Sequence, residues 1–211
     1  MRRSHAIFLS AAFLLFQAPD TARADDPGFP IHTVPQSFHL VATNGSAPAT
    51  IGQFEVVLRD IAHNPIPDAS IVVDLSMCTE LALATDQLDP DAVVNCAAKT
   101  TRKLTDANGR AVFCIIGGSR TGVPASTLLA GGRIYGNGTL IATPTVSAFD
   151  LDGQQGLGAG DLAVFLGDFA SGEIFGRSDF DDSGNLGARD LVIWLTAFSS
   201  GTQVVSAPSC P

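Results

Sequence analysis

The sequence predicts a mainly β protein, an antiparallel β-sandwich followed by a small C-terminal module of two helices. Two observations lead to this fold class. Short apolar and β-branched segments alternate with Gly, Pro and Asn turns over residues 37–147, and an acidic loop followed by an amphipathic helix occurs twice over residues 148–202. The 211 residues suffice for one domain of ordinary size and one small one.

The N-terminus has the pattern of a secretory signal peptide. Two arginines near the start precede an apolar run over residues 6–16, and residues 22–24 form a small-x-small cleavage site. We expect residues 1–24 to be removed and the protein to be secreted from a bacterial cell, or displayed on its surface. The apolar run is too short to span a bilayer comfortably, and no later segment approaches that length. A retained N-terminal anchor is the alternative.

Residues 25–36 contain three prolines and are expected to form an extended leader. The sandwich follows over residues 37–147. Turn signals such as Asn137-Gly138 separate its apolar segments, and seven or eight short strands with regular turns favour a sandwich. The expected strands are residues 38–42, 53–59, 69–76, 99–104, 111–116, 127–130, 132–135 and 139–142.

Two segments of this region resemble the bacterial Ig-like repeats of invasin-type and carboxypeptidase-regulatory-like domains. They are Leu58-Arg-Asp-Ile-Ala-His-Asn-Pro-Ile-Pro-Asp-Ala-Ser-Ile-Val-Val73 and Thr105-Asp-Ala-Asn-Gly-Arg-Ala-Val-Phe113. In those folds the first segment is a strand, a Pro-bearing turn and the partner strand, and the second is a turn leading into a buried strand. The resemblance implies an Ig-like fold. It implies little about function, because such sandwiches serve as spacers, adhesin stalks and binding modules.

Four cysteines in an exported chain point to disulfides, and four cysteines allow three pairings. The segment between Cys78 and residue 99 is longer than a hairpin needs, so we expect it to cross one end of the sandwich. A Cys78–Cys96 disulfide is our first expectation, because it would tie down this long loop. Cys114 and Cys210 would then form a second pair that clamps the tail, residues 203–211, onto the sandwich.

One twelve-residue loop has the ligand spacing of an EF-hand-type calcium loop: Asp179-Phe-Asp-Asp-Ser-Gly-Asn-Leu-Gly-Ala-Arg-Asp190. Asp179, Asp181 and Ser183 offer side-chain oxygens at positions one, three and five. Asn185 offers its backbone carbonyl, and Asp190 closes the set. Calcium takes about six to eight oxygen ligands, so alternate carboxylates on a tight turn suit it. The sequence therefore predicts a Ca²⁺ site at residues 179–190.

The same pattern recurs in a degraded form at residues 150–161. Asp150, Asp152, Gln154, Gly156 and Asp161 occupy the ligand positions. A glutamine stands at position six, where glycine is expected, so we expect this Ca²⁺ site to be the weaker one.

The residues after each loop follow the i, i+3, i+4, i+7 spacing of one helical face. They are Leu162, Phe165, Leu166 and Phe169 after the first loop, and Leu191, Trp194, Leu195 and Phe198 after the second. We expect one amphipathic helix after each loop, with the two helices packed antiparallel through Phe165, Phe169, Trp194 and Phe198.

The segments before the loops do not read as the entering helices of a true EF-hand. Residues 144–149 read as the end of a strand, and residues 170–178 as a Gly-containing connector. Duplicated loop-helix halves that close their ligand set with Asp resemble the type I dockerin module, which docks onto cohesin domains in cellulosomes. The resemblance covers residues 148–202 and implies a cohesin-like or other extracellular protein partner. Ala159-Gly160 and Ala188-Arg189 depart from the Ser-Thr type pair that family members commonly carry.

The composition argues against a nucleic-acid partner, because the formal net charge is −9 and no Lys/Arg cluster is present. No serine elbow, HExxH motif or phosphate-binding glycine loop occurs. We therefore expect a non-catalytic protein of recognition or assembly. Two alternatives stay open: an adhesin or spacer whose calcium module is purely structural, and an extracellular polysaccharide hydrolase with an unrecognised acidic site.

Overall fold

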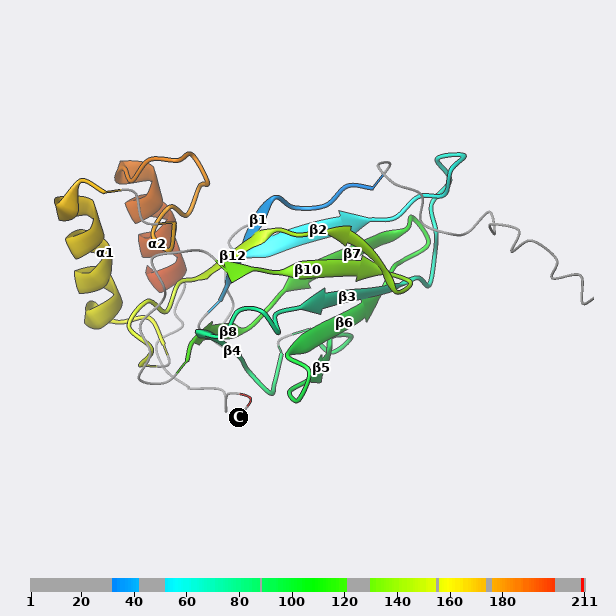
Figure 1. Ribbon diagram of the computed structural model, residues 1–211, viewed down its shortest axis with the longest axis horizontal. Coiled ribbons are helices and arrows are strands. Elements are labelled where there is room, and N and C mark those ends of the chain that lie inside the picture. The colour runs from blue at the N-terminus through cyan, green and yellow to red at the C-terminus, as the bar shows by residue number, and fades with distance from the viewer. Residues whose placement is uncertain are drawn as a thin grey trace, which may run out of the picture.

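The computed structural model describes residues 32–41, 52–87, 89–120, 130–154, 156–173, 176–199 and 210. The expected signal peptide, most of the expected leader and most of the strand expected at 127–130 lie outside these ranges. The described chain is mainly β, with antiparallel sheets followed by two C-terminal helices (Figure 1). Across these ranges, no helix combines the length and the apolarity that crossing a membrane requires.

The largest sheet has five strands, and each is antiparallel to its neighbours. Alternate residues of its central strand, such as Ile71 and Val73, are buried, as the period-two pattern predicts. Asn137 and Gly138 both have positive φ and join two of the strands in a tight hairpin. The strand order is β11 (Thr139–Ala142), β10 (Arg133–Gly136), β3 (Ser70–Asp74), β6 (Thr100–Leu104) and β5 (Val93–Asn95).

A second antiparallel pair, β2 (Gln53–Val57) and β7 (Arg110–Cys114), shares its core with the five-stranded sheet. Phe54 stacks on Phe113 with ring centroids 5.2 Å apart, and on Phe38 at 4.3 Å. These rings and the aliphatic residues of β3 and β10 form one buried cluster. This part of the chain, residues 32–148, is called the β region below.

The end of the β region nearest the helices is built differently from our expectation. β1 (Ser37–Leu40) pairs with β12 (Thr145–Ala148) in parallel, so the fold is not wholly antiparallel. β12 also pairs with β9 (Ala130–Gly131), and β4 (Leu81–Leu83) pairs with β8 (Gly117–Ser119). The segment expected to be one long loop therefore contains β4 and β5. Both are three residues long, too short for a clear periodic signal.

Neither expected disulfide forms, because the chain pairs Cys96 with Cys210. The reason is the position of Cys210, whose backbone N–H donates to the Leu83 carbonyl at 2.7 Å, so that Cys210 lies beside β4. Cys78 is free and faces the core, and burial raises the pKa of its thiol to about 12. Cys114 is free and half-buried.

Two helices, α1 (Ala159–Ser171) and α2 (Ala188–Ser199), lie together at one end of the β region (Figure 1). Each follows one acidic loop, as the repeated pattern predicts. Their shared core joins Phe165 of α1 and Trp194 of α2 to the loop residues Phe149 and Phe180. Phe180 stacks on Phe149 at 4.9 Å and on Phe165 at 6.2 Å. The expectation that Phe169 fills this core is wrong, since its side chain is 53 % exposed.

Candidate metal centre

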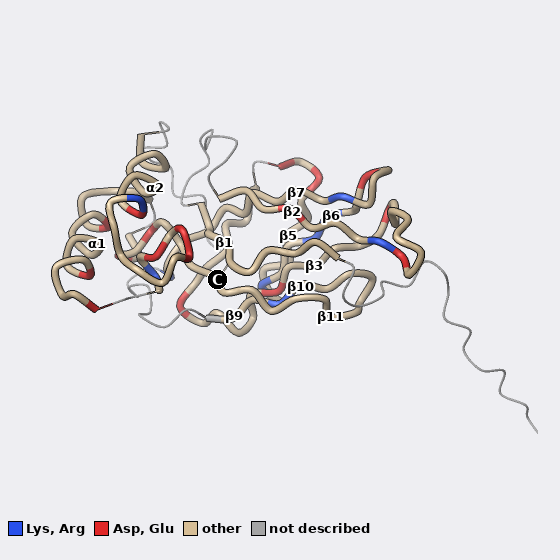
Figure 2. Tube along the Cα trace, turned by 90° about the horizontal axis from the view of Figure 1, so that it is seen from above, with Lys and Arg blue, Asp and Glu red and all other residues tan. Residues whose placement is uncertain are grey.

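Two clusters of three aspartates lie where the acidic loops meet the helices. In each cluster, the three carboxylates bring one oxygen apiece to within 4.8 Å of one another, and the first and last aspartates are buried. Figure 2 shows acidic residues beside α1 and α2. Site 1 is Asp150, Asp152 and Asp161; site 2 is Asp179, Asp181 and Asp190. Either cluster could hold a metal ion.

The closing carboxylates, Asp161 and Asp190, stand at the third position of α1 and α2. In both, one oxygen accepts a hydrogen bond from the N–H of the glycine before the helix, Gly158 at 2.7 Å and Gly187 at 2.8 Å. The other oxygen accepts a hydrogen bond from the N–H of the third loop residue. The donor is Asp152 in the first loop, at 3.0 Å, and Asp181 in the second loop, at 3.2 Å. A carboxylate is also favoured at the positive end of a helix dipole. Each helix start therefore fixes one ligand in the same way.

The first aspartates are held by the turns of their own loops. Asp150 accepts from the N–H of Gly153 at 2.9 Å. Asp179 accepts from the N–H groups of Ser183 at 3.0 Å and Gly184 at 2.8 Å. Gly153 and Gly184 both have a φ of 74°, a conformation that strains other residues. These glycines let the backbone curl around the carboxylates.

The remaining predicted ligands differ between the loops. In the second loop the Ser183 hydroxyl donates to the Asn185 carbonyl at 3.2 Å, so the oxygens of positions five and seven are neighbours. In the first loop Gln154 is exposed, and its N–H donates to Asp152 at 2.9 Å. Gly156, at position seven, has a φ of 150° and follows a residue outside the described ranges. The second loop thus brings two further oxygens side by side.

The carboxylates repel one another without a cation between them. Burial, followed by the charge of Asp161, raises the pKa of Asp150 to about 7. Burial also raises the pKa values of Asp161 and Asp179. The pKa of Asp181 is lowered, mainly by the hydrogen bond from the Ser183 side chain. Negative charge concentrated in a partly desolvated site is what a bound cation would neutralise.

The β region supports the first loop directly. The backbone carbonyl of Asp150 accepts hydrogen bonds from the Ser119 hydroxyl at 2.6 Å and from the Ser119 N–H at 3.3 Å. The neighbouring residue, Gly118, lies against the carboxylate, and a Cβ there would come within 2.6 Å of Asp150 Oδ2. Strand β8 therefore needs glycine at this position to let site 1 form.

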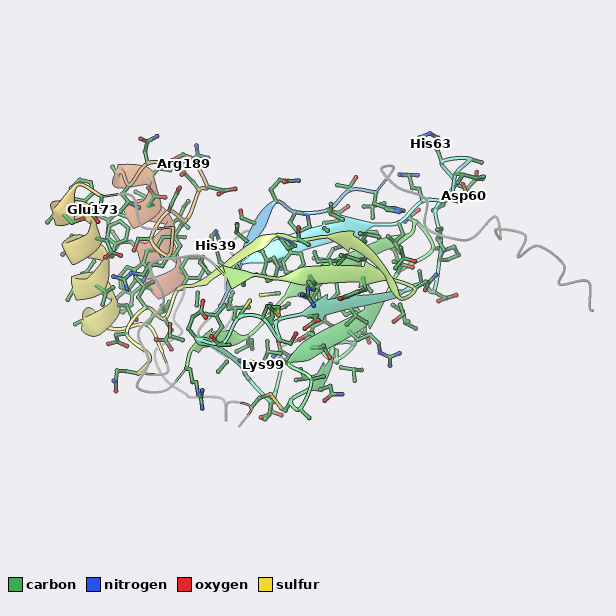
Figure 3. The ribbon with its side chains drawn as sticks, in the orientation of Figure 1. His39, Asp60, His63, Lys99, Glu173 and Arg189 are labelled. Atoms are coloured by element: carbon green, nitrogen blue, oxygen red, sulfur yellow. A yellow bond between two sulfur atoms is a disulfide. The ribbon has the colours of Figure 1, made fainter. Side chains whose placement is uncertain are left out.

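His39 of β1 connects the β region to the second loop, and Figure 3 shows it at the junction with the helices. Its Nε2 donates to the Phe180 carbonyl at 2.8 Å, and its Nδ1 pairs with the Ser147 hydroxyl. The ring packs against Phe149 and Phe180, with centroids 5.4 and 5.6 Å away. Burial lowers the pKa of His39. The indole N–H of Trp194 adds a hydrogen bond to the Phe149 carbonyl at 3.2 Å.

Sequence reasoning assigned no role to His39 or Ser119. Each lies far along the chain from the loop that it contacts, and neither belongs to a motif. The place of His39 in an expected strand indicates nothing about the loop that it contacts. The contact with the loop depends on how β1 and the module meet in space.

Comparisons with protein-family models, with curated proteins and with solved structures found no match to this chain. The chemistry of the two sites follows from their own residues. Both offer hard carboxylate oxygens on tight turns, a donor set that suits divalent cations such as Ca²⁺, Mg²⁺ and Mn²⁺.

Proposed function

We propose that this chain is an exported, non-catalytic protein in which an Ig-like β-sandwich carries a dockerin-like module that binds calcium and docks another extracellular protein. The observation that carries the proposal is the pair of carboxylate triads, Asp150/Asp152/Asp161 and Asp179/Asp181/Asp190, at equivalent positions of a repeated loop and helix. An acidic turn that is merely solvated would not need carboxylates at the same positions of two loop-helix units.

Calcium is favoured over other divalent cations by the size and composition of the donor sets. The second loop offers three carboxylates together with Ser183 and the Asn185 carbonyl. Magnesium prefers a rigid octahedron that keeps several waters, whereas calcium accepts a larger, flexible shell of oxygens. Zinc prefers nitrogen and sulfur ligands, and the triads contain neither.

The docking role is supported by apolar side chains on the outer faces of the helices. Each helix has a second apolar stripe, one residue C-terminal to its buried stripe. Leu166 of α1 and Leu195 of α2 occupy equivalent positions in this second stripe, and both are exposed. Phe169 and Val192 are more than half exposed beside them. A contiguous patch of exposed apolar side chains often marks a site of protein–protein interaction.

The second candidate is an adhesin or spacer in which calcium only stabilises the fold. His39 favours it, because its hydrogen bond to the Phe180 carbonyl ties the second loop to the β region. In this alternative the module would serve the sandwich to which it is attached, and it would bind no other protein.

A capture experiment separates the two candidates. We expect the immobilised mature protein to retain a protein from the secreted fraction of the producing cell when calcium is present and to release it into EDTA. Leu166→Ser/Leu195→Ser should weaken binding of that purified protein by at least about tenfold, since both apolar anchors would be lost. Ile61→Ser, an exposed apolar residue of the β region, is the matched control. Calcium-dependent melting with no calcium-dependent capture would favour the structural alternative.

The stability of the metal-free protein and the additional stabilisation by calcium are expected to change in opposite directions with pH. Folded Asp150 binds a proton below about pH 7, whereas an ordinary aspartate binds one only near pH 4. The metal-free protein should therefore lose stability as the pH rises from about 5 to 8. Calcium must displace that proton, so its affinity at site 1 should fall roughly tenfold per unit below pH 7.

Calorimetric melting at about pH 5 and pH 8, in EDTA and in calcium, measures both trends. The stabilisation by calcium should be larger at pH 8. Asp150→Asn should reduce the pH dependence of the metal-free protein, because the carboxyl whose pKa is raised to about 7 is gone. A metal-free wild type that is most stable at about pH 8 would contradict the prediction.

A further inference from the structure

A buried ion pair in the module lies outside both carboxylate triads. Asp168, in the third turn of α1, is 4 % exposed. Its carboxylate accepts two hydrogen bonds from the Arg177 guanidinium, from Nε at 2.8 Å and from Nη2 at 2.6 Å. The hydroxyl of Ser178, which is fully buried, donates to the same carboxylate at 2.6 Å. Arg177 and Ser178 are the two residues immediately before Asp179, the first ligand of site 2.

The two repeats hold their first ligands in different ways. Asp150 lies two residues after the end of β12, and Ser119 of β8 donates a hydrogen bond to its backbone carbonyl. Asp179 instead follows the connector that leaves α1 at Gly172. The repeat equivalents of Asp168, Arg177 and Ser178 are Ala197, Ala148 and Phe149, so these positions cannot form the same network between α2 and the first loop. This network holds the first ligand of site 2, whereas strands β8 and β12 hold the first ligand of site 1.

Helix α1 joins this network to site 1. Its buried residues are Asp161, Phe165 and Asp168, spaced i, i+4 and i+7 along one face. Asp161 is a member of site 1, and Asp168 holds the residues that lead into site 2. Because an α-helix is stiff over two turns, a shift of Asp161 moves Asp168 with it.

We propose that Asp168, Arg177 and Ser178 are positioning residues for site 2, and that they couple the affinities of the two sites through α1. The inference rests on calcium binding as proposed above. An ion at site 1 fixes the start of α1, which fixes Asp168 and thereby Asp179. Since coupling between sites is reciprocal, an ion at site 2 raises the affinity of site 1 by the same factor.

Calcium titration of the full mature chain, by calorimetry and by the fluorescence of the single tryptophan, Trp194, tests the proposal. Asp168→Ala should weaken site 2 roughly 10- to 100-fold, the usual effect of removing a residue that orients a metal ligand. Site 1 should bind at least about fivefold more weakly in Asp179→Ala than in the wild type, because site 2 is then empty. In the Asp168→Ala background, adding Asp179→Ala should leave the affinity of site 1 unchanged.

The loss of this mutual dependence separates positioning from a general weakening of the fold. Ser178→Ala, which keeps the ion pair, should weaken site 2 severalfold and serves if Asp168→Ala folds poorly. Glu173→Ala is the matched control, since it removes a nearby exposed carboxylate (Figure 3) and should leave both affinities unchanged.

The outcomes that overturn the inference differ from those that overturn the proposed function. A wild type that binds no calcium would overturn both. A wild type that binds two ions, together with an Asp168→Ala variant that binds both as tightly, would overturn this inference alone. This inference alone would also be overturned if Asp179→Ala still weakened calcium binding at site 1 in the Asp168→Ala background.

Discussion

Calcium is expected to raise the melting temperature of the metal-free protein by roughly 10 °C, and Asp179→Ala is expected to remove most of that rise. An ion present at about 1,000 times its Kd stabilises the folded state by about 4 kcal/mol, and each kcal/mol shifts the melting of a chain of this size by about 2–4 °C. Asp179 is the first carboxylate of site 2, whose loop also brings the Ser183 hydroxyl beside the Asn185 carbonyl.

Differential scanning calorimetry in EDTA and in about 1 mM calcium measures the shift. Asp182→Asn is the control, because Asp182 is an exposed acidic residue of the same loop outside the triad. Its φ of 54° is one that asparagine also tolerates, so the backbone should be undisturbed. If calcium left the melting of the wild type unchanged, the two triads would be solvated turns and the proposed function would fail.

Cys210→Ser is expected to lower the free energy of unfolding by about 2–5 kcal/mol, because the Cys96–Cys210 bond closes a long loop that restricts the unfolded chain. Its sequence separation is 114 residues. The variant also releases the backbone hydrogen bond from Cys210 to Leu83 on β4. Urea denaturation under non-reducing conditions measures the loss.

Cys114→Ser is the matched control for this disulfide, since Cys114 is a free, half-buried thiol and its replacement should change stability far less. Equal losses in the two variants would mean that Cys114 takes part in a disulfide. A Cys210→Ser variant as stable as the wild type would contradict the structural role of the pair.

The parts of the fold that repeat along the chain could be predicted from the sequence. Asp179, Asp181 and Asp190 stand at fixed positions of one turn, so their spacing alone indicated that they would converge. The strands around Ile71 and Phe113 were predictable because alternate residues face the core. Local geometry determines both features, and it follows from residues that are near one another in sequence.

The parts that depend on contacts between distant segments could not be predicted. Cys96 was expected to pair with the nearer Cys78, yet the C-terminal end reaches it from the far end of the chain. No sequence motif marks Asp168, because Arg177 and Ser178 meet its carboxylate only in the folded chain. The parallel pairing of β1 with β12 likewise joins segments more than 100 residues apart, and no local pattern encodes it.

That parallel pairing has a mechanical consequence. Ser37 lies opposite Thr145 and Leu40 opposite Ala148, and β12 continues directly into the first acidic loop. Suppose that the module is held by a partner while the N-terminal side of β1 is held elsewhere. Tension then pulls the two strands past each other along their length and loads all of their hydrogen bonds at once. A pair loaded in shear shares the load over all of its bonds, whereas a pair that is peeled open carries it on one bond at a time, so β1 and β12 are placed to bear a pull between the N-terminal side of β1 and the module.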